Sequence, residues 1–324
     1  MSQSTMSEVI LPDTAHGASR PWVNTFRRLL RKKLAIIGIL VILTFYMVGA
    51  LAPVLAPYDY NEQDLSTTFQ SPSREHLLGT DRLGRDMFSR VVWAARTTAI
   101  VTAAALLTGG VVLGVGLGLI SGYLGGKVDS LIMRVGDMFL ALPSLLMLIL
   151  FTATIRPRYI GWAHSFEDWA GWKGFVSSGA PDYILVFGAL SLFSWVGSAR
   201  LIRSQVLALR ETQYVLAARS IGASRRRIIF VHLLPNVSNL IIVGMSAGMG
   251  GIVGSEIALS WLGLGVQPPN PSFGGLIREW SGLSNLRTHP FLLLGPAGVA
   301  AALIFSWNLL GDALNDVLNP RRGR

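Results

Sequence analysis

The chain has 324 residues, of which 51% are hydrophobic and only 14% are charged. Soluble domains carry about 25% charged residues, so this composition indicates a membrane protein and argues against a soluble globular domain. The absence of cysteine excludes disulfides, thiolate metal sites and a cysteine nucleophile. A formal charge of +10 would indicate nucleic acid in a soluble protein. Here most basic residues flank apolar runs, as the positive-inside rule requires, so we predict no nucleic-acid partner.

Residues 1–33 are predicted to be a cytoplasmic tail that ends in an amphipathic segment. Residues 1–20 are polar and aperiodic, which favours disorder, and a basic cluster then precedes the first apolar run. That run, Leu34 to Tyr58, has no charge over 25 residues. It fits a membrane span of about 20 residues better than a signal-peptide core of about 7–15. Although Ala50-Leu51-Ala52 resembles a cleavage box, we predict an uncleaved first transmembrane helix.

Six apolar stretches are long enough to cross a bilayer, which predicts an all-α membrane protein with six transmembrane helices. They cover about 34–56, 97–120, 134–154, 183–200, 236–257 and 290–311. Pro143 lies inside the third, so we expect a kink there. The second is rich in glycine, and the spacing favours close approach of helix backbones over a substrate site. These glycines are Gly109, Gly110, Gly114, Gly116, Gly118 and Gly122.

The spans divide the chain into a first helix with an extracytoplasmic loop over 34–96, a five-helix core over 97–314 and a cytoplasmic tail over 315–324. An even number of spans places both termini on one side of the membrane. The segments on that side hold 18 of the 28 Lys and Arg residues, and the other loops hold 10. Both termini are therefore predicted to be cytoplasmic.

The segment 155–182 is predicted to be an amphipathic outer loop. Its tryptophans, Trp162, Trp169 and Trp172, fit the headgroup level of the membrane better than a stacking site for sugar or peptide.

Ionisable and sulfur-containing side chains near the spans have structural interpretations. Glu256 falls at the outer end of the fifth span, and Asp137 and Asp312 fall near cytoplasmic ends. All three are expected to reach an interface and act as anchors, not as a proton relay. Met245 and Met249 share a helix face, for which core packing is favoured over a cavity lining.

The basic loop at 201–235 combines a short helix, a glycine turn and a second helix. Thr212 is a candidate N-cap of the first helix, and Gly222 fits the left-handed position after it. Ser224 is predicted to cap the second helix, which should end near Pro235. The first helix presents small and apolar residues in a cytoplasmic loop: Tyr214, Val215, Ala217, Ala218 and Ile221. Such a surface is suited to dock into a groove on another protein, but on these residues alone folding back on its own helices is the favoured interpretation.

The sequence Ala217-Ala218-x3-Gly222, followed by Leu234-Pro235, resembles the EAA loop of ABC-importer permeases, Glu-Ala-Ala-x3-Gly-x9-Ile-x-Leu-Pro. Leu216 stands where the family has Glu, and His232 where it has Ile. The resemblance implies a type I ABC importer permease fold, in which this helix is the coupling helix that inserts into an ATPase subunit. The coupling residues that it implies are Tyr214, Ala217, Ala218, Ile221, Gly222 and Pro235.

Further segments resemble the permeases for oligopeptides, dipeptides and nickel, and the C-type permease of the dipeptide/oligopeptide system is the most similar. They lie at residues 76–86, 121–129, 258–269 and 311–321, so the resemblance spans about 70 to 320. The segment 155–182 has the character of an insertion. The resemblance also implies a second coupling loop with Lys127 and Asp129. It further implies an outer gate facing a binding protein at Gly263, Gly265, Gln267 and Pro268, for which a tight surface connection is the alternative.

The implied partners are a homologous second permease subunit, two cytoplasmic ATPase subunits, an extracytoplasmic substrate-binding protein and membrane lipid. The implied location is the cytoplasmic (inner) membrane of a bacterium or archaeon. Gly126-Lys127 is followed by Val128, so the chain lacks the ATP-binding Walker A motif. The five histidines include no pair four residues apart. No enzyme activity, cofactor or metal is therefore predicted.

Peptide is the expected cargo, with nickel chelates or glycosides as alternatives. A proton-coupled secondary transporter is the main rival function, and it is disfavoured by the lack of a carboxylate in the middle of a span. An intramembrane enzyme is disfavoured because no catalytic constellation gathers at one membrane depth.

Overall fold

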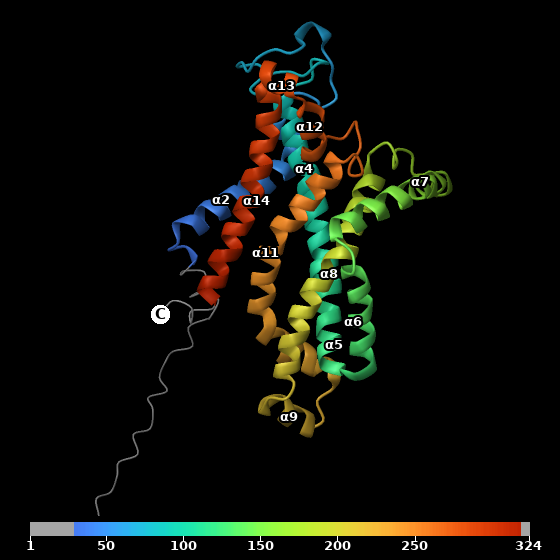
Figure 1. Cartoon of the computed structure of the whole chain (residues 1–324), viewed down its shortest axis with the longest axis vertical. Coiled ribbons are helices and arrows are strands. Elements are labelled where there is room, and N and C mark those ends of the chain that lie inside the picture. Colours follow the sequence, from blue (N-terminus) through green and yellow to red (C-terminus); the bar gives the residue numbers. More distant parts are fainter. Residues whose placement is uncertain (1–28, 319–324) are drawn as a thin grey trace, which may run out of the picture.

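A computed structural model describes residues 29–318, and in that range the chain consists of helices and connecting segments without an assigned strand. The helices form an elongated bundle (Figure 1). One end carries the short helix α9 and is called the α9 end. The opposite end carries the long connection between α3 and α4 together with α12 and α13, and is called the cap end. The predicted tail at 1–20 and residues 319–324 lie outside the described residues.

Long helices run between the two ends, and short helices lie at the turns. In chain order they are α2 (Lys33–Ala50), α3 (Ala52–Leu55), the 3-10 turn η1 (Leu65–Thr67), α4 (Met87–Ala105), the π-helical η2 (Leu106–Val115), α5 (Gly116–Leu124), α6 (Gly126–Leu140), α7 (Ser144–Ala170), α8 (Ala180–Leu209), α9 (Gln213–Ser220), α10 (Arg225–Arg227), the π-helical η3 (Ile228–Leu233), α11 (Leu234–Trp261), α12 (Phe273–Trp280), α13 (Leu283–Thr288) and α14 (Pro290–Leu318).

The apolar runs coincide with long helical segments. Five are long and apolar enough to cross a membrane: Lys33–Ala50, Met87–Leu124, Ala180–Leu209, Arg225–Trp261 and Pro290–Leu318. A sixth is the pair α6 and α7, which is bent by 86° at its break. The predicted all-α fold is confirmed, and the third span is broken where a kink was expected. Pro143 lies in the break with an extended ψ of 126°, and its missing N–H prevents the helix from continuing through it.

Four element boundaries differ from the sequence-based expectation. α4 begins at Met87, inside the expected outer loop, because Asp86 caps it and Arg90 is neutralised by carboxylates. Residues 155–170, expected as loop, continue α7, and α14 continues to Leu318. The helix after Ser224 does not end near Pro235 but runs on to Trp261, because Pro235 stands in the first turn of α11, after a π-helical segment.

A stripe of glycines packs the second span against α8, as the sequence predicted. A Cβ on Gly109 would lie 2.6 Å from the Cα of Ser191, and one on Gly118 would lie 2.8 Å from the carbonyl oxygen of Ala199. Gly114 and Gly122 are similarly crowded by α8. The step from Gly109 to Gly114 is five residues and falls within η2, whose i→i+5 bonding keeps both glycines on one face. The close approach of the two backbones therefore requires glycine at these positions.

Gly118→Ala and Gly116→Ala form a matched pair that tests this packing. The alanine Cβ at 118 would press on α8, whereas no atom lies within 4 Å of the position at 116. Overpacking costs about 1–3 kcal/mol, so we expect Gly118→Ala to lower the Tm of the purified protein in detergent. Gly116→Ala should leave the Tm unchanged or raise it, since helical Gly→Ala gains about 0.5–1 kcal/mol. Equal Tm values for the two variants would contradict the claim that close packing against α8 requires glycine at position 118.

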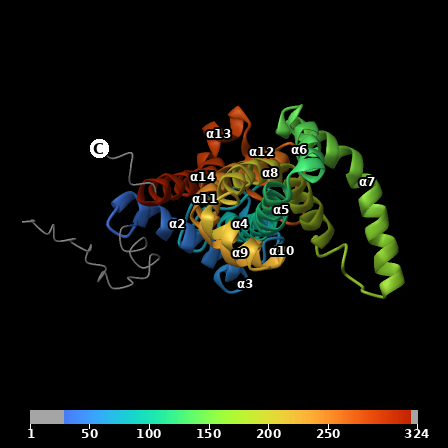
Figure 2. The ribbon, with the colours of Figure 1, turned by 90° about the horizontal axis from the view of Figure 1, so that it is seen from below.

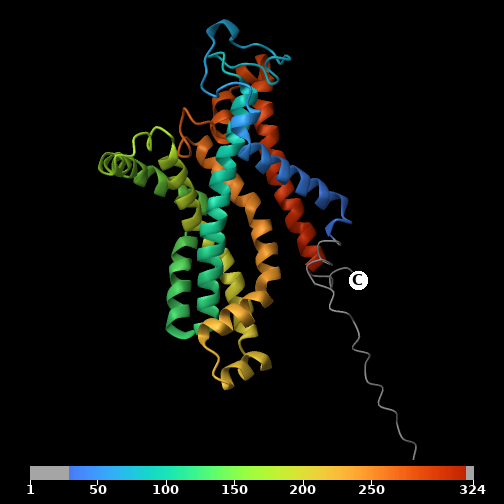
Figure 3. The same ribbon diagram turned by 180° about the vertical axis from the view of Figure 1, so that it is seen from behind.

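The two described ends of the chain meet at the side of the bundle (Figure 3). Leu29 packs on the last turns of α14, and Lys32 Nζ lies 2.7 Å from Asp316 Oδ2. α2 and α14 therefore begin and end at the same level, as an even number of crossings requires.

Candidate functional site

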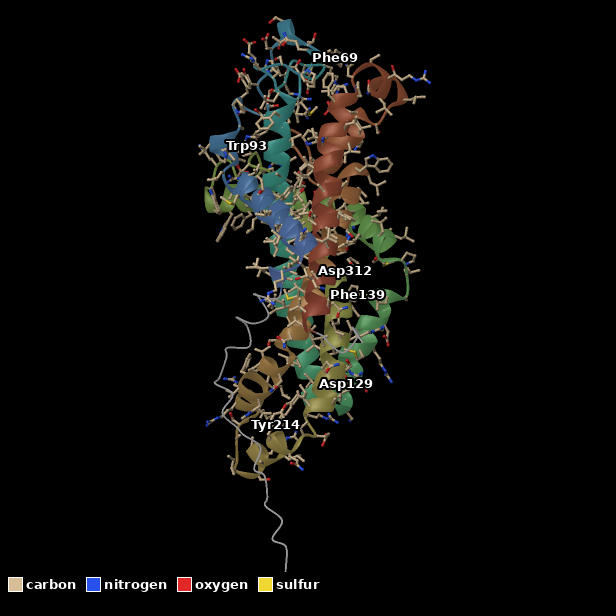
Figure 4. The ribbon with its side chains drawn as sticks, turned by 90° about the vertical axis from the view of Figure 1, so that its left-hand side faces the viewer. Phe69, Trp93, Asp129, Phe139, Tyr214 and Asp312 are labelled. Carbon is tan, nitrogen blue, oxygen red and sulfur yellow. The ribbon has the colours of Figure 1, made fainter. Side chains whose placement is uncertain are left out.

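Helix α9 projects at one end of the bundle, beyond the ends of α2 and α14 (Figures 1 and 4). Thr212 has the extended backbone of an N-cap, with φ −75° and ψ 152°. Its hydroxyl does not cap α9 but donates to the carbonyl of Leu209 at 2.6 Å. Thr212 is thus at the N-cap position, as predicted, but its side chain makes no capping bond to an amide of α9. Its hydroxyl is bonded to the end of α8 instead. That bond ties α9 directly to α8.

Gly222 ends α9 as predicted. Its φ of +82° lies in the left-handed region that favours glycine. The Gly222 amide donates to the carbonyl of Arg219 at 2.9 Å, and the Ala223 amide donates to that of Ala218 at 3.0 Å. These two bonds form a Schellman motif, which fixes the direction in which the chain leaves the helix.

The two faces of α9 have different environments. Val215 is fully buried and Ala218 is 6% exposed, and Val215 belongs to an apolar cluster with Ile228 and Leu233. Ala218 therefore faces its own subunit, contrary to the expectation that it contacts a partner. Tyr214, Leu216 and Ile221 are exposed at 42%, 42% and 86%. Ala217 is also exposed, and so is Pro235, which stands in the first turn of α11.

A run of cations follows α9. Ser224 Oγ accepts the amide of Arg227 at 3.3 Å and so caps α10, as predicted. Arg225, Arg226 and Arg227 are exposed, and among the described residues none of them has a carboxylate partner. At the α9 end, an exposed apolar helix surface is thus followed by three arginines without a carboxylate partner among the described residues.

The turn between α5 and α6 lies beside α9. The guanidinium of Arg219 lies 5.2 Å from the ring centre of Tyr123, which is a cation–π contact between the two segments. An open groove of about 610 Å³ separates them, and its lining includes Gly125, Lys127 and Arg225. The two predicted coupling loops therefore form one continuous surface.

Within this second loop the two predicted residues differ. Lys127 is exposed. Asp129 instead accepts two bonds of 2.5 Å from Arg203 and a bond from the hydroxyl of Ser121. Asp129 (Figure 4) therefore joins α6 to α5 and α8. Because Arg203 neutralises its carboxylate, Asp129 offers no free charge to a partner.

At the cap end a buried ionic cluster holds the connection between α3 and α4, and sequence reasoning did not find it. Asp81 is fully buried, and its Oδ2 accepts Nε of Arg85 at 2.6 Å and a guanidinium nitrogen of Arg90 at 2.7 Å. Glu279 of α12 accepts bonds of 3.1 Å from both arginines. Two carboxylates thus neutralise two arginines. The segment 76–86 was recognised as a motif, but nothing in the sequence pointed to Glu279.

The same connection is closed by local contacts. His76 Nδ1 lies 2.9 Å from Asp86 Oδ1, and Gly84 at φ +71° approaches the carbonyl of Asp64 too closely for any side chain. The hydroxyl and amide of Ser66 donate to Asp64 and lower the pKa of its carboxyl. These contacts hold the connection between α3 and α4 in a defined conformation.

The predicted outer-gate residues follow α11 at the cap end. Gly263, at φ +78°, ends α11 in a second Schellman motif, and Gly265 lies against the backbone of Ser260 where no side chain fits. Gln267 Nε2 donates to the carbonyls of Gly263 and Gly265 at 3.0 and 2.9 Å, which makes the segment a tight turn. Gly263, Gln267 and Pro268 line a cavity of about 550 Å³ with residues of α7 and α8.

The sequence matches known families over most of its length. Residues 114–324 match the family described as binding-protein-dependent transport system inner membrane component, and residues 20–72 match the N-terminal TM domain of oligopeptide transport permease C. This chain belongs to the binding-protein-dependent permease family. The predicted resemblance is confirmed, and it begins at residue 20, earlier than expected.

Three curated relatives of the permease illustrate its family. The dipeptide transport system permease protein DppC of Alkalihalophilus pseudofirmus is 34% identical over 96% of this chain and 93% of its own length. The oligopeptide transport system permease protein OppC of Bacillus subtilis is 34% identical over 93% and 90%. The glutathione transport system permease protein GsiD of Pectobacterium atrosepticum is 33% identical over 93% and 91%. The permease is thus a multi-pass membrane subunit of an ABC importer.

Of the side chains near the spans, Glu256 differs from expectation. Glu256 does not reach an interface: it is fully buried, and it accepts bonds from Thr98 at 2.8 Å and Ser260 at 3.0 Å. It fastens α11 to α4. Asp137 is exposed and pairs with Arg200. Met249 is 1% exposed, in keeping with core packing. Within residues 29–318 no three potential metal ligands cluster.

Proposed function

We propose that this permease imports peptides together with a homologous second permease, two ATPase subunits and an extracytoplasmic binding protein. The continuous surface at the α9 end carries the proposal: an exposed apolar helix fixed by its Schellman motif, beside the α5–α6 turn. Tyr214, Ala217 and Ile221 are its contact residues, and Lys127 and Arg219 flank them. The names of the relatives, which refer to dipeptides, oligopeptides and glutathione, support a peptide cargo.

The helices provide the route by which ATP-driven closure at α9 acts on the cap end. α9 is bonded to the end of α8 through Thr212, and Ser224 caps the helical run from Arg225 to Trp261. Packed helices transmit displacement because close-packed protein interiors have low compressibility. α11 ends at the turn that holds Gly263 and Gln267. A push on α9 therefore moves the proposed outer gate and switches access between the two sides.

The orientation follows from charge. The arginine run at the α9 end supports a cytoplasmic location for that end, with the cap end outside and facing the binding protein. Both chain termini are then cytoplasmic.

The test is uptake by the reconstituted complex. Proteoliposomes that contain both permeases, the ATPases and the binding protein are supplied with labelled dipeptide, a longer peptide, a nickel chelate or a glycoside. We expect peptide uptake only when ATP is supplied on the side of the membrane that carries the ATPase subunits. Uptake by the permease alone under a proton gradient, without ATP, would establish the rival secondary transporter. ATP-driven uptake of the chelate or glycoside instead of peptide would reassign the cargo.

A further inference from the structure

The far part of α7 leaves the bundle. α7 is bent by 86° from α6, and Figure 2 shows it extending sideways, away from the other helices. Its buried residues are Leu148 and Thr152 near its start, and Ala163 farther along. Residues 155–175, which we call the arm, comprise the rest of α7 and the turn that follows.

Aromatic and apolar side chains form a stripe along the arm. Ile155, Tyr159, Trp162, Phe166 and Trp169 recur at alternating steps of four and three residues, which places them on one helix face. Trp162 and Trp169 are 67% and 83% exposed. His164 and Asp168 lie on the opposite face, by the same helical spacing. The arm is thus an amphipathic helix whose apolar face is half-buried at Ile155 and Tyr159 and exposed from Trp162 to Trp169.

The tip of the arm is ordered by its own contacts. Gly171 ends α7 at φ +65°, and the carboxylate of Glu167 accepts the amides of Gly174 at 2.7 Å and Val176 at 3.0 Å. These bonds fold the chain back so that Trp172 and Phe175 extend the stripe, with ring centres 5.6 Å apart. The aromatic surface is therefore preformed.

We propose that the arm lies along the membrane surface at the cap end, with its aromatic stripe in the headgroup region. The arm lies between α6 and α8, which both belong to helical segments long and apolar enough to cross a membrane, and the 86° bend turns α7 away from the direction of α6. Tryptophan and tyrosine favour the membrane–water interface because their rings combine an apolar body with a polar edge. Helices with one apolar and one polar face lie in that interface. The occupant of the apolar face is lipid, and this assignment holds whichever cargo the permease carries.

The root of the arm is tied to the proposed outer gate. Arg156 donates to Asp182 Oδ1 at 2.9 Å, and Asp182 Oδ2 accepts the amide of Gln267 at 3.3 Å. Arg156 and Ile160 form one wall of the 550 Å³ cavity at that gate. An arm held by lipid thus fixes the position of one wall while α11 moves the other.

The absence of cysteine in this chain makes a direct test possible. Single cysteines replace Trp162 or Trp169 on the stripe and His164 or Asp168 on the opposite face, in a complex whose other subunits lack cysteine. Each is labelled with bimane and reconstituted in vesicles with headgroup-labelled or chain-labelled nitroxide lipids. We expect shallow nitroxide lipid to quench the stripe positions several-fold more than the opposite face, and aqueous iodide to show the reverse order.

Two results would overturn the arm's assignment to lipid. Equal iodide quenching of both faces would mean that the arm stands free in water. Protection of the stripe that appears only when the binding protein is added would assign it to that protein. ATP-driven uptake is measured for each variant to show that it is folded, and Tyr159→Cys provides a third stripe position if replacement of a tryptophan impairs folding.

Discussion

Gly222→Val is expected to uncouple ATP hydrolysis from peptide uptake while leaving the permease inserted and folded. Gly222 holds φ +82°, which a β-branched residue rarely adopts. Left-handed backbone costs a non-glycine residue about 1–2 kcal/mol, and 1.4 kcal/mol is about tenfold in an equilibrium constant. The Schellman motif should therefore open, and α9 should lose its fixed orientation toward the ATPase. Uptake and ATP hydrolysis are measured in parallel in proteoliposomes, and we expect uptake to fall about tenfold or more.

Gly222→Asn is the matched control at the same site. Asparagine is similar in size to valine but tolerates left-handed backbone. No atom lies within 4 Å of a Cβ at this position, so the Cβ of either residue has open space within the subunit. Asn should retain much more uptake than Val. Equal losses in both variants would show that side-chain bulk at the ATPase contact matters, and normal uptake by Gly222→Val would refute the coupling role of this turn.

Asp81→Ala is expected to cause the largest loss of stability. It removes the fully buried carboxylate that binds Arg85 and Arg90, and leaves Glu279 to balance two arginines alone. Breaking a buried ion pair costs about 3–5 kcal/mol, because the remaining charge stays desolvated. The cap end should loosen, which we expect to appear as a clear fall in Tm and as faster proteolysis of the connection between α3 and α4.

Glu75→Ala provides the control for this prediction. Glu75 lies in the same connection, is exposed and has no ion-pair partner among residues 29–318. The net charge changes by the same amount, so a general charge effect would shift both variants equally. Arg82, which is 3.7 Å from Glu279 and mostly exposed, offers a second comparison, since surface pairs contribute about 0–1 kcal/mol.

The proposed coupling loop at 201–235 shows how far local sequence can predict structure. The end of α9 at Gly222 and the cap at Ser224 were both predictable, because each depends on residues within a few positions in the chain. The hydroxyl of Thr212 was misassigned because it can either accept an amide of α9 as a cap or donate to the carbonyl of Leu209, and sequence does not rank the two bonds. Ala218 was placed on the docking surface because the pattern does not say which face of α9 its own subunit covers.

Long-range partners account for the features that local sequence did not specify. Glu256 was expected at an interface, but Thr98 of α4 lies beside it across 158 positions of sequence. Glu279 joins Arg85 across 194 positions. Asp129 was expected on a contact surface and is instead bound by Arg203. In each case the burial of a charge depends on a partner from another helix, which neither composition nor spacing specifies.

The sequence by itself determined the membrane class, the six apolar segments, the glycine stripe and the coupling-loop motif. Hydrophobic length and local backbone preference are properties of contiguous residues, so they can be read without a fold. The tertiary structure decided which charges are paired inside, that the two proposed coupling loops form one surface, and that the aromatic segment at 155–175 is an arm outside the bundle. These depend on how helices pack, because packing alone sets which side chains lose contact with water or lipid.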